Sequence, residues 1–371
     1  PSPSDLARCN ELLPTVSRTF ALTIRVLPPS LRDSVTIAYL LCRVADVLED
    51  SPGLDARTRR AGLLALAEAL GGVSQDSDAH GAGLRFEESD PSMMDRLIAS
   101  LRETPHEGLD AASRGLLESP AEVFRAFLDL PPLVRGVIAR WVQAMSRGMA
   151  EFVAKEASGP ESTGLRLVLQ TREEMRAYAY CVAGTVGHLL TELFTHHLRL
   201  GEESRTARLR ELAVPFGLGL QLTNILQDLA EDRERGCSYL PEDLARSHGT
   251  TLARLHQASD RTAALRVVAD VIEEAARHLD DALEFTLLLP RTAPRIRLFC
   301  LWPIFFARRT LVRLWAEPAV LDGPQKVRIS RAEVRSLMRN TVLGCGSNAR
   351  LARLYRQECD RLAERAAIRP V

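Results

Sequence analysis

The sequence predicts an all-α protein, and three observations support this fold class. Apolar residues recur at helical spacing along almost the whole chain, for example over residues 122–156 and 266–289. Ala, Leu, Arg and Glu, which are good helix formers, dominate the composition, and aromatic residues make up only 5% of it. Alternating strand patterns bounded by Asn-Gly or Asp-Gly turns are nearly absent.

The predicted helices follow one another with two interruptions. Residues 71–83 are rich in Gly, Ser and Asp and predict a surface loop, and residues 158–164 predict a second loop. Helical segments of the same character resume on both sides, so we expect one domain over residues 1–371. Gly184 and Gly187 lie three positions apart on a predicted helix and indicate close approach of another helix.

The composition bounds the class of protein. The chain has 371 residues and 46% hydrophobic content, enough for a large core. Its 48 basic and 48 acidic residues cancel, which gives no reason to expect a nucleic acid partner. Seven scattered cysteines without a C-x-x-C pair or zinc spacing favour a reduced, cytoplasmic chain. The apolar run at 298–307 contains a proline and is too short to span a bilayer.

The pattern Asp-x-x-Glu-Asp occurs twice, at residues 46–50 and 228–232. Positions i, i+3 and i+4 of a helix share one face, so each motif is expected to project three carboxylates together. The six acidic positions are Asp46, Glu49, Asp50, Asp228, Glu231 and Asp232. A single cluster of this kind is usually a solvated acidic face, because exposed like charges on a helix repel only weakly.

The neighbours of the two motifs favour a functional interpretation. Each motif lies at the end of an apolar stretch, residues 35–45 and 214–226, whereas a surface helix would show a charged stripe along its length. Carboxylates at the border of a core need partners. Mg²⁺ prefers carboxylate oxygens, retained waters and substrate phosphate. The duplication therefore predicts two acidic faces that bind Mg²⁺ together with a diphosphate.

Other polar residues extend these faces. Gln221 and Asn224 lie on the same side of the predicted helix as Asp228, where they would need hydrogen-bond partners such as a diphosphate or metal-bound water. Arg43 precedes Asp46 by three positions and can pair with a carboxylate or with a phosphate.

Five stretches then make the sequence recognisable. They are SRTF at 17–20, RVADVLED at 43–50, MSRGMAEF at 145–152, YAYCVAGTVG at 178–187 and QLTNILQDLAEDRERGCSYLP at 221–241. In this order they resemble the squalene and phytoene synthase family, the head-to-head prenyl synthases. The region 299–338 is more similar to the squalene synthase branch than to the shorter phytoene synthases.

The resemblance implies a single isoprenoid-synthase-type helical domain around a central cavity, with the two acidic motifs facing each other across its mouth. The implied reaction joins two farnesyl diphosphates through presqualene diphosphate to squalene, with Mg²⁺ and NADPH as cofactors. It also implies prenyl diphosphates as substrates. The resemblance leaves the oligomeric state open, and we expect a monomer in the cytoplasm. Peripheral association with a membrane for release of the apolar product is a further expectation.

The resemblance also implies which residues form the site. The metal ligands would be Asp46, Glu49, Asp50, Asn224, Asp228, Glu231 and Asp232. The substrate contacts would be Ser17, Arg18, Phe20, Arg43, Gln221, Asn224 and Phe299. The NADPH contacts would be Arg18, Arg43 and Arg328. The catalytic residues would be Asp46, Asp50, Asp228, Asp232 and Tyr178, whose hydroxyl would orient a diphosphate or assist deprotonation. Without the resemblance, Tyr178 is an ordinary helix tyrosine and Phe299 a core residue.

Two positions depart from the family's pattern. Gln227 and Cys237 stand where the family usually carries basic residues that bind diphosphate. Arg233 and Arg235 are close in sequence, but an arginine on another helical face is not equivalent. No glycine-rich fingerprint follows a predicted strand, so the NADPH expectation depends on the resemblance alone.

Three alternatives remain open. A non-reducing member would stop at presqualene diphosphate or dehydrosqualene, or would make phytoene from geranylgeranyl diphosphate. A terpene cyclase or head-to-tail synthase also uses Asp-rich Mg²⁺ sites, but the paired motifs and the stretch at 178–187 disfavour it. A non-catalytic assembly factor on the same fold would be expected to lose the carboxylates, and this chain has all six.

Overall fold

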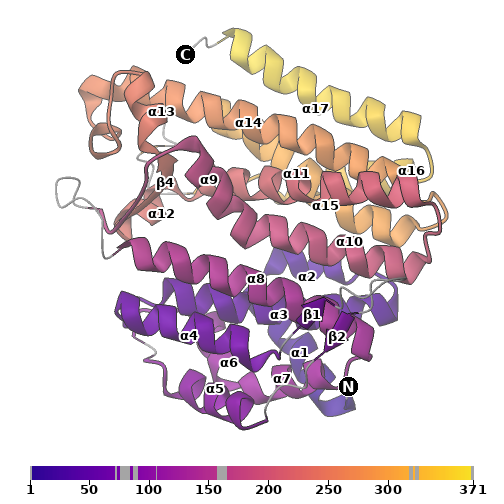
Figure 1. The fold of residues 1–371 in the computed structure, drawn as a ribbon. Helices are drawn as coiled ribbons and strands as arrows, with labels where there is room; N and C mark the ends of the chain where they lie inside the picture. The colour runs from indigo at the N-terminus through magenta and orange to yellow at the C-terminus, as the bar shows by residue number, and fades with distance from the viewer. Residues whose placement is uncertain are drawn as a thin grey trace. The chain divides into compact units, whose positions relative to one another are not determined.

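A computed structural model shows a chain that is almost entirely helical, with four short strands among the residues it describes (Figure 1). The described residues are 2–71, 73–75, 84–86, 91–105, 107–156, 165–316, 321 and 326–368. The all-α prediction is confirmed. The chain divides into two compact units, of which unit 1 comprises Pro1–Ala157 and His188–Leu200, and unit 2 comprises Ser158–Gly187 and Gly201–Val371. The expectation of one domain stays a prediction.

Unit 1 is built on three long helices, α3, α4 and α8, which pack against one another. Its elements are α1 (Pro3–Val16), α2 (Arg18–Ile24), α3 (Pro29–Asp50), α4 (Ala56–Ala69), β1 (Val73–Gln75), β2 (Leu84–Phe86), α5 (Pro91–Glu103), α6 (Ala111–Glu118), α7 (Pro120–Leu128) and α8 (Pro132–Glu156). The C-terminal part of α10 (Thr185–Leu198) also belongs to it. Pro29 in the first turn of α3 suits a helix start, because its fixed φ is helical and it lacks the N–H that would be unpaired there. The interior of α3 is buried almost throughout.

Unit 2 contains a second group of long helices. Its elements are β3 (Leu167–Leu169), α9 (Arg172–Ala179), the π-helix η2 (Tyr180–Gly184), the start of α10, α11 (Glu203–Gln227), α12 (Leu229–Glu234), β4 (Cys237–Pro241), α13 (Glu242–Ser247), η3 (Leu252–Arg254), η4 (Ala258–Asp260), α14 (Arg261–Leu288), α15 (Pro294–Ala316), α16 (Arg331–Gly344) and α17 (Asn348–Ile368). Helix α11 packs along α14, α14 packs against α15, and α15 contacts α16 and α17 (Figure 1).

Two glycines allow helices of unit 2 to approach closely. A Cβ atom on Gly187 would overlap the main-chain oxygen of Ala213, and one on Gly217 would overlap the main-chain oxygen of Ala183. The prediction of close approach is therefore confirmed for Gly187, whereas Gly184 faces an aromatic ring of its own helix. These contacts hold the η2–α10 segment directly against α11.

The two predicted loops lie largely outside the described residues. Of the loop predicted at 71–83, residues 73–75 form strand β1, which pairs antiparallel with β2, and residues 72 and 76–83 are not described. The loop at 158–164 lies wholly outside the described residues. Within the described part of the chain, no helix combines the length and the apolar character needed to cross a membrane.

Candidate functional site

The first acidic motif forms the last turn of α3 in unit 1. Asp46 is half-buried and accepts a hydrogen bond from Arg43 Nη1 at 2.9 Å. Glu49 is buried and Asp50 is half-buried, so the three carboxylates lie at the edge of the core rather than on an open surface. The location predicted for this motif, at the end of an apolar helix, is confirmed.

Burial and crowding disfavour the charged forms of two carboxylates of this motif, those of Asp46 and Glu49. Burial raises the pKa of Asp46, with Asp50 acting in the same direction and Arg43 against it. Burial also raises the pKa of Glu49 well above its usual range, and the neighbouring Asp50 and Asp46 add to the effect. Carboxylates that are desolvated and close together in this way are stabilised by an additional cation.

A buried arginine holds the main chain of the motif. Arg59 of α4 is 1% exposed and donates a hydrogen bond to the main-chain oxygen of Glu49 at 2.7 Å. The same guanidinium pairs with Glu156 at the end of α8, at 3.0 Å for one of the two bonds. Helix α3 therefore ends at a fixed point, and its last carboxylates extend from a rigid support.

Two of the other unit 1 residues predicted for the site, Arg18 and Phe20, belong to α2, and Ser17 directly precedes this helix. Ser17 caps α2 by accepting a hydrogen bond from the main-chain N–H of Phe20 at 3.1 Å, so it has a structural role there. The half-buried Phe20 ring lies 5.3 Å from the ring of Tyr39, measured between centroids. Burial raises the pKa of Tyr39 to about 12, while Ser17 and Arg43 act against it. Tyr39 was missed from sequence, and the side chain of Arg18 lies outside the described part of the chain.

The second acidic motif, in unit 2, differs from the expected continuous helix. Helix α11 ends at Gln227 and α12 begins at Leu229, so Asp228 lies at the break, although the N–H of Asp232 still donates to the main-chain oxygen of Asp228 at 2.7 Å. The three carboxylates have different surroundings: Asp228 is half-buried, Glu231 is exposed and Asp232 is buried beside Arg235. The expectation of one continuous helix through this motif is therefore wrong, whereas the expectation that its three carboxylates project together stays a prediction.

Lys326 is the main residue that sequence reasoning missed. Its ammonium contacts a carboxylate oxygen of Asp228 and lies 3.9 Å from Glu231 Oε2. Burial raises the pKa of Asp228, and the ammonium of Lys326 acts against that shift. Gln227 Nε2 donates to the main-chain oxygen of Val327 at 2.7 Å, which brings the segment of Lys326 to the end of α11. A signal existed, because Lys326 is one of only two lysines in a chain whose other basic residues are arginines.

A second missed residue lies beside Cys237. Strands β3 and β4 pair in parallel with Leu167 opposite Cys237, and Arg166 Nη2 donates to Cys237 Sγ at 3.3 Å. A guanidinium is thus present at one of the two positions where the sequence departs from the family's pattern. Arg235, which sequence reasoning offered as a substitute, pairs instead with Asp232.

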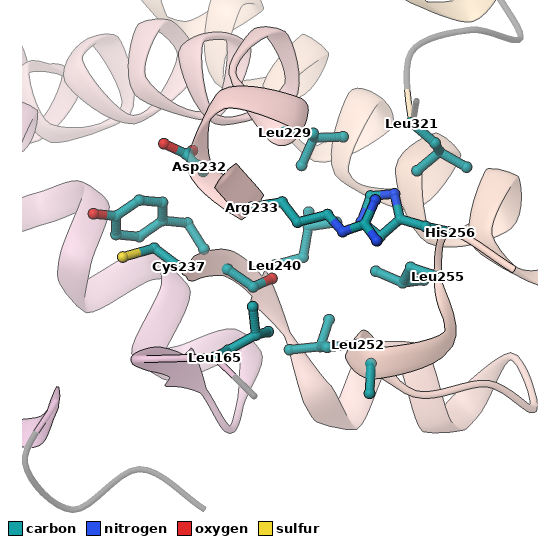
Figure 2. Close-up of a pocket in the computed structure, with 13 residues that line it drawn as sticks. Leu165, Leu229, Asp232, Arg233, Cys237, Leu240, Leu252, Leu255, His256 and Leu321 are labelled. Atoms are coloured by element: carbon teal, nitrogen blue, oxygen red, sulfur yellow. The ribbon is translucent and has the colours of Figure 1, made fainter. Parts of the chain in front are cut away.

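A cavity of about 270 Å³ lies next to this strand within unit 2. Figure 2 shows Asp232 and Arg233 of α12 and Cys237 of β4 around it. Leucines supply much of the remaining wall, and His256 adds a second basic group. The cavity therefore combines an apolar lining with a buried carboxylate and a guanidinium.

Tyr178 is connected to the wall of this cavity. It is 5% exposed, and its ring stacks on that of Tyr239 with centroids 4.4 Å apart and planes 20° apart. Tyr239 lines the cavity. Directly after α9, residues Tyr180–Gly184 form a π-helix, a rare geometry that often marks functional positions. Tyr178 is therefore a buried residue whose ring packs directly against a residue of the cavity wall, and its predicted role in catalysis stays a prediction.

The remaining predicted residues have mixed surroundings. Gln221 and Asn224 both lie in α11, as predicted. Gln221 is half-buried, whereas Asn224 is exposed, so the expectation that Asn224 needs a hydrogen-bond partner within an apolar helix is wrong. Phe299 of α15 is buried, and Arg328 is exposed two positions after Lys326. Each unit thus contains some of the residues predicted for the site, including one of the two acidic motifs.

The carboxylates fit Mg²⁺ by their chemistry. Among the described residues no group of three or more acidic, histidine or cysteine side chains is already arranged around a metal position. Mg²⁺ does not require one, since it commonly takes one or two carboxylates and completes its shell with waters and phosphate oxygens. Asp46 and Asp228 provide hard oxygen ligands, and the ammonium on Asp228 shows that this carboxylate accepts a cation. The donor set therefore suits a hard divalent cation.

Comparisons with curated proteins identify relatives of the chain. It is 28% identical over 327 residues to squalene synthase ERG9 of Candida albicans, covering 87% of this chain and 65% of that protein. It is 29% identical over 343 residues to squalene synthase BSS of Botryococcus braunii, covering 91% of this chain and 65% of that protein. The chain thus spans about two thirds of the length of these two relatives.

Solved structures share the fold. A structure of TcSQS with the ligand BPH1237 matches with a TM-score of 0.76 and 24% identity over 98% of this chain and 92% of that chain. A dehydrosqualene synthase with a bound ligand matches with a TM-score of 0.58 and 21% identity over 92% of this chain and 96% of that chain. The family model for squalene/phytoene synthases matches residues 13–333. The chain therefore belongs to the squalene/phytoene synthase family.

Proposed function

We propose that this chain is a prenyltransferase that joins two molecules of farnesyl diphosphate head to head and reduces the product to squalene. The observation that carries the proposal is the pair of carboxylate motifs, each at the end of an apolar helix, in a chain that matches the family over residues 13–333. The curated relatives with which it aligns are squalene synthases.

Each motif has residues suited to a diphosphate. Asp46, Glu49 and Asp50 in unit 1, with Asn224, Asp228, Glu231 and Asp232 in unit 2, would hold Mg²⁺. When bound, the metal neutralises a leaving diphosphate and so assists ionisation of the allylic carbon–oxygen bond. The chain's own cations would then bind the remaining phosphate oxygens through charge-assisted hydrogen bonds. In unit 1 that cation is Arg43, and in unit 2 the cations are Arg166 and Lys326.

The rest of the reaction needs an apolar site that excludes water from a carbocation. In unit 2, Tyr178 and Tyr239 present stacked rings, and the Tyr178 hydroxyl would orient a diphosphate or assist deprotonation in the first half-reaction. Phe299 would contribute an aromatic face that stabilises positive charge. Arg18, Arg43 and the exposed Arg328 would contact NADPH, which would supply the hydride for the second half-reaction.

Product analysis tests the proposal directly. The protein is incubated with farnesyl diphosphate, with and without Mg²⁺ and with and without NADPH, and the products are identified by mass spectrometry. Squalene that forms only with both additions supports the complete reaction. Presqualene diphosphate or dehydrosqualene regardless of NADPH would retain the condensation and remove the reductive step. A parallel incubation uses geranylgeranyl diphosphate. If the protein consumes geranylgeranyl diphosphate but not farnesyl diphosphate, the longer compound is its substrate. If it consumes neither compound, a non-catalytic role is favoured.

Two carboxylate variants test the site. Asp46→Asn and Asp228→Asn keep the size of each side chain and remove the negative charge, so we expect turnover to fall below detection while the thermal unfolding midpoint changes little. Asp95→Asn, on the exposed side of α5, is the matched control and should retain full turnover. Turnover that survives in both site variants would contradict the metal assignment.

We also propose that the protein is a cytoplasmic monomer that associates peripherally with membranes to release its apolar product. Sedimentation velocity would give the oligomeric state, and co-sedimentation with phospholipid vesicles would measure the association. A stable dimer, or no vesicle binding during turnover, would contradict these two parts of the proposal separately.

A further inference from the structure

The ammonium of Lys326 lies at the second acidic motif, where a bound metal cation would be expected. It contacts Asp228, whose Oδ1 atom is shielded from solvent, and it lies 3.9 Å from Glu231 Oε2. The two side chains of the close pair are similarly protected, with 22% of Lys326 and 25% of Asp228 exposed. An ion pair with this degree of burial is screened less by water than a surface pair.

The segment that carries Lys326 is held at both ends. At its start, Gln227 Nε2 donates to the main-chain oxygen of Val327 at 2.7 Å. At its end, Ser330 caps α16 and forms a capping box with Glu333. Glu333 in turn accepts hydrogen bonds from Arg309 at 3.0 Å and Arg313 at 2.6 Å. The ammonium is therefore presented to Asp228 by an anchored main chain.

Lys326 and a divalent cation compete for the same carboxylate, that of Asp228. Direct ligation would place a metal about 2.1 Å from an oxygen of this group, close to the ammonium. The two cations would also repel each other at that separation. Binding of one must therefore weaken binding of the other, and the effect is reciprocal because both draw on the same carboxylate.

We propose that Lys326 is an internal counter-ion of the second acidic motif, which holds Asp228 in the metal-free chain and is displaced when a divalent cation binds there. The inference rests on the proposed metal-binding function of this motif. Displacement removes one of the contacts that hold residues 326–330 to the end of α11, so metal binding loosens that segment. The assignment gives Lys326 a role in metal affinity and in the order of the 326–330 segment.

The test measures binding of Mn²⁺ alone to substrate-free protein by electron paramagnetic resonance. Lys326→Met removes the charge and keeps the length of the side chain, and we expect it to bind Mn²⁺ about tenfold more tightly than the wild type. Lys326→Arg keeps a cation and should stay within about twofold of the wild type. Lys155→Met changes the only other lysine, on α8, and is the matched control with unchanged affinity.

A second measurement reads the segment itself. Hydrogen exchange at residues 327–330 should accelerate when Mg²⁺ is added to the wild type. In Lys326→Met this exchange should already be fast without Mg²⁺ and should change little when Mg²⁺ is added.

A third measurement follows the lysine side chain. Because the chain has only two lysines, selective labelling of the lysine Cε carbon gives two NMR signals. Mg²⁺ should shift the signal of Lys326 and leave that of Lys155 in place.

The outcomes separate this inference from the proposed function. Equal or weaker Mn²⁺ binding in Lys326→Met, with binding reduced by Asp228→Asn, would overturn the counter-ion role and keep the metal site. Failure of every variant and of the wild type to bind Mn²⁺ would overturn the metal site and the counter-ion role together. Thermal unfolding of each variant shows whether it is folded, and Lys326→Gln replaces Lys326→Met if the latter does not fold.

Discussion

Gln227 donates a hydrogen bond from its side-chain amide to the main-chain oxygen of Val327, 100 positions later, at 2.7 Å. The residue that departs from the family's pattern at this position thus links the end of α11 to the segment that precedes α16. An arginine there would present a cation, whereas the glutamine fixes the segment that carries Lys326 to Asp228.

This link predicts a local effect of Gln227→Ala. Loss of one hydrogen bond to a main-chain oxygen should lower the free energy of unfolding by about 1 kcal/mol. Amide exchange at residues 327–330 should accelerate more than exchange in α11. The matched change Gln221→Ala, about one and two-thirds turns earlier on the same helix, should leave exchange in that segment unchanged. Uniform acceleration in both variants would show that Gln227 does not position the segment.

Gly187 predicts a strong effect of one added methyl group. A Cβ atom there would overlap the main-chain oxygen of Ala213, and main chain cannot move aside as a flexible side chain can. We expect Gly187→Ala to lower the free energy of unfolding by about 3 kcal/mol, measured by urea denaturation. Gly201→Ala is the control, since no heavy atom lies within 4 Å of its added Cβ. Similar stabilities for the two variants would be inconsistent with the close helix approach.

Glu333 predicts a loss of stability in acid. Burial alone would raise the pKa of Glu333, but hydrogen bonds from Arg313, Ser330 and Arg309 outweigh it and lower that pKa to about 2. A lowered pKa in the folded state gives stability that is present above the ordinary value of 4.5 and is lost as the pH falls toward 2. The wild type should therefore lose more stability than Glu333→Gln as the pH falls between those values. Parallel pH profiles of the two proteins would contradict the charge network.

Tyr178 allows its ring and its hydroxyl to be tested separately. Tyr178→Phe keeps the stacking on Tyr239, so the variant should remain folded, which a thermal unfolding curve checks. If the hydroxyl moves a proton or orients a diphosphate, kcat should fall by about 100-fold with little change in KM. Tyr178→Leu should lose stability as well as turnover. Full turnover in Tyr178→Phe would leave the residue with a packing role only.

Arg166 predicts a defect in substrate binding. Its guanidinium lies beside Cys237, where the family's pattern would have a basic side chain. Arg166→Gln should lower kcat/KM for farnesyl diphosphate by about tenfold, the effect of one charge-assisted hydrogen bond. The double variant Arg166→Gln with Cys237→Arg should recover part of the loss. If Arg166→Gln turns over substrate as the wild type does, the diphosphate is held by other cations.

Features set by a local sequence pattern could be predicted, whereas contacts between residues far apart in the sequence could not. The end of α3 at Asp50 could be predicted, because an apolar helix that ends in acid is a local pattern. The break at Asp228 was not predicted, since the i, i+3, i+4 spacing assumes a continuous helix. Neither Lys326 nor Arg166 was predicted to be near the acidic residues, because each reaches its partner through chain folding that no local pattern encodes. The lysine count of the chain was the one available signal.

The π-helix η2 has a consequence for the two contacts on either side of it. A π-turn holds about one more residue than an α-turn, and each α-helical residue advances the helix by about 100°, so η2 shifts the face that follows it relative to the face before it. Tyr178 lies before this shift and stacks on Tyr239, whereas Gly187 lies after it and meets Ala213. A continuous α-helix of the same length could aim only one of these two residues correctly. Because of the extra residue, one segment directs Tyr178 toward the ring of Tyr239 and Gly187 toward the main chain of Ala213, which lie in different directions around the helix axis.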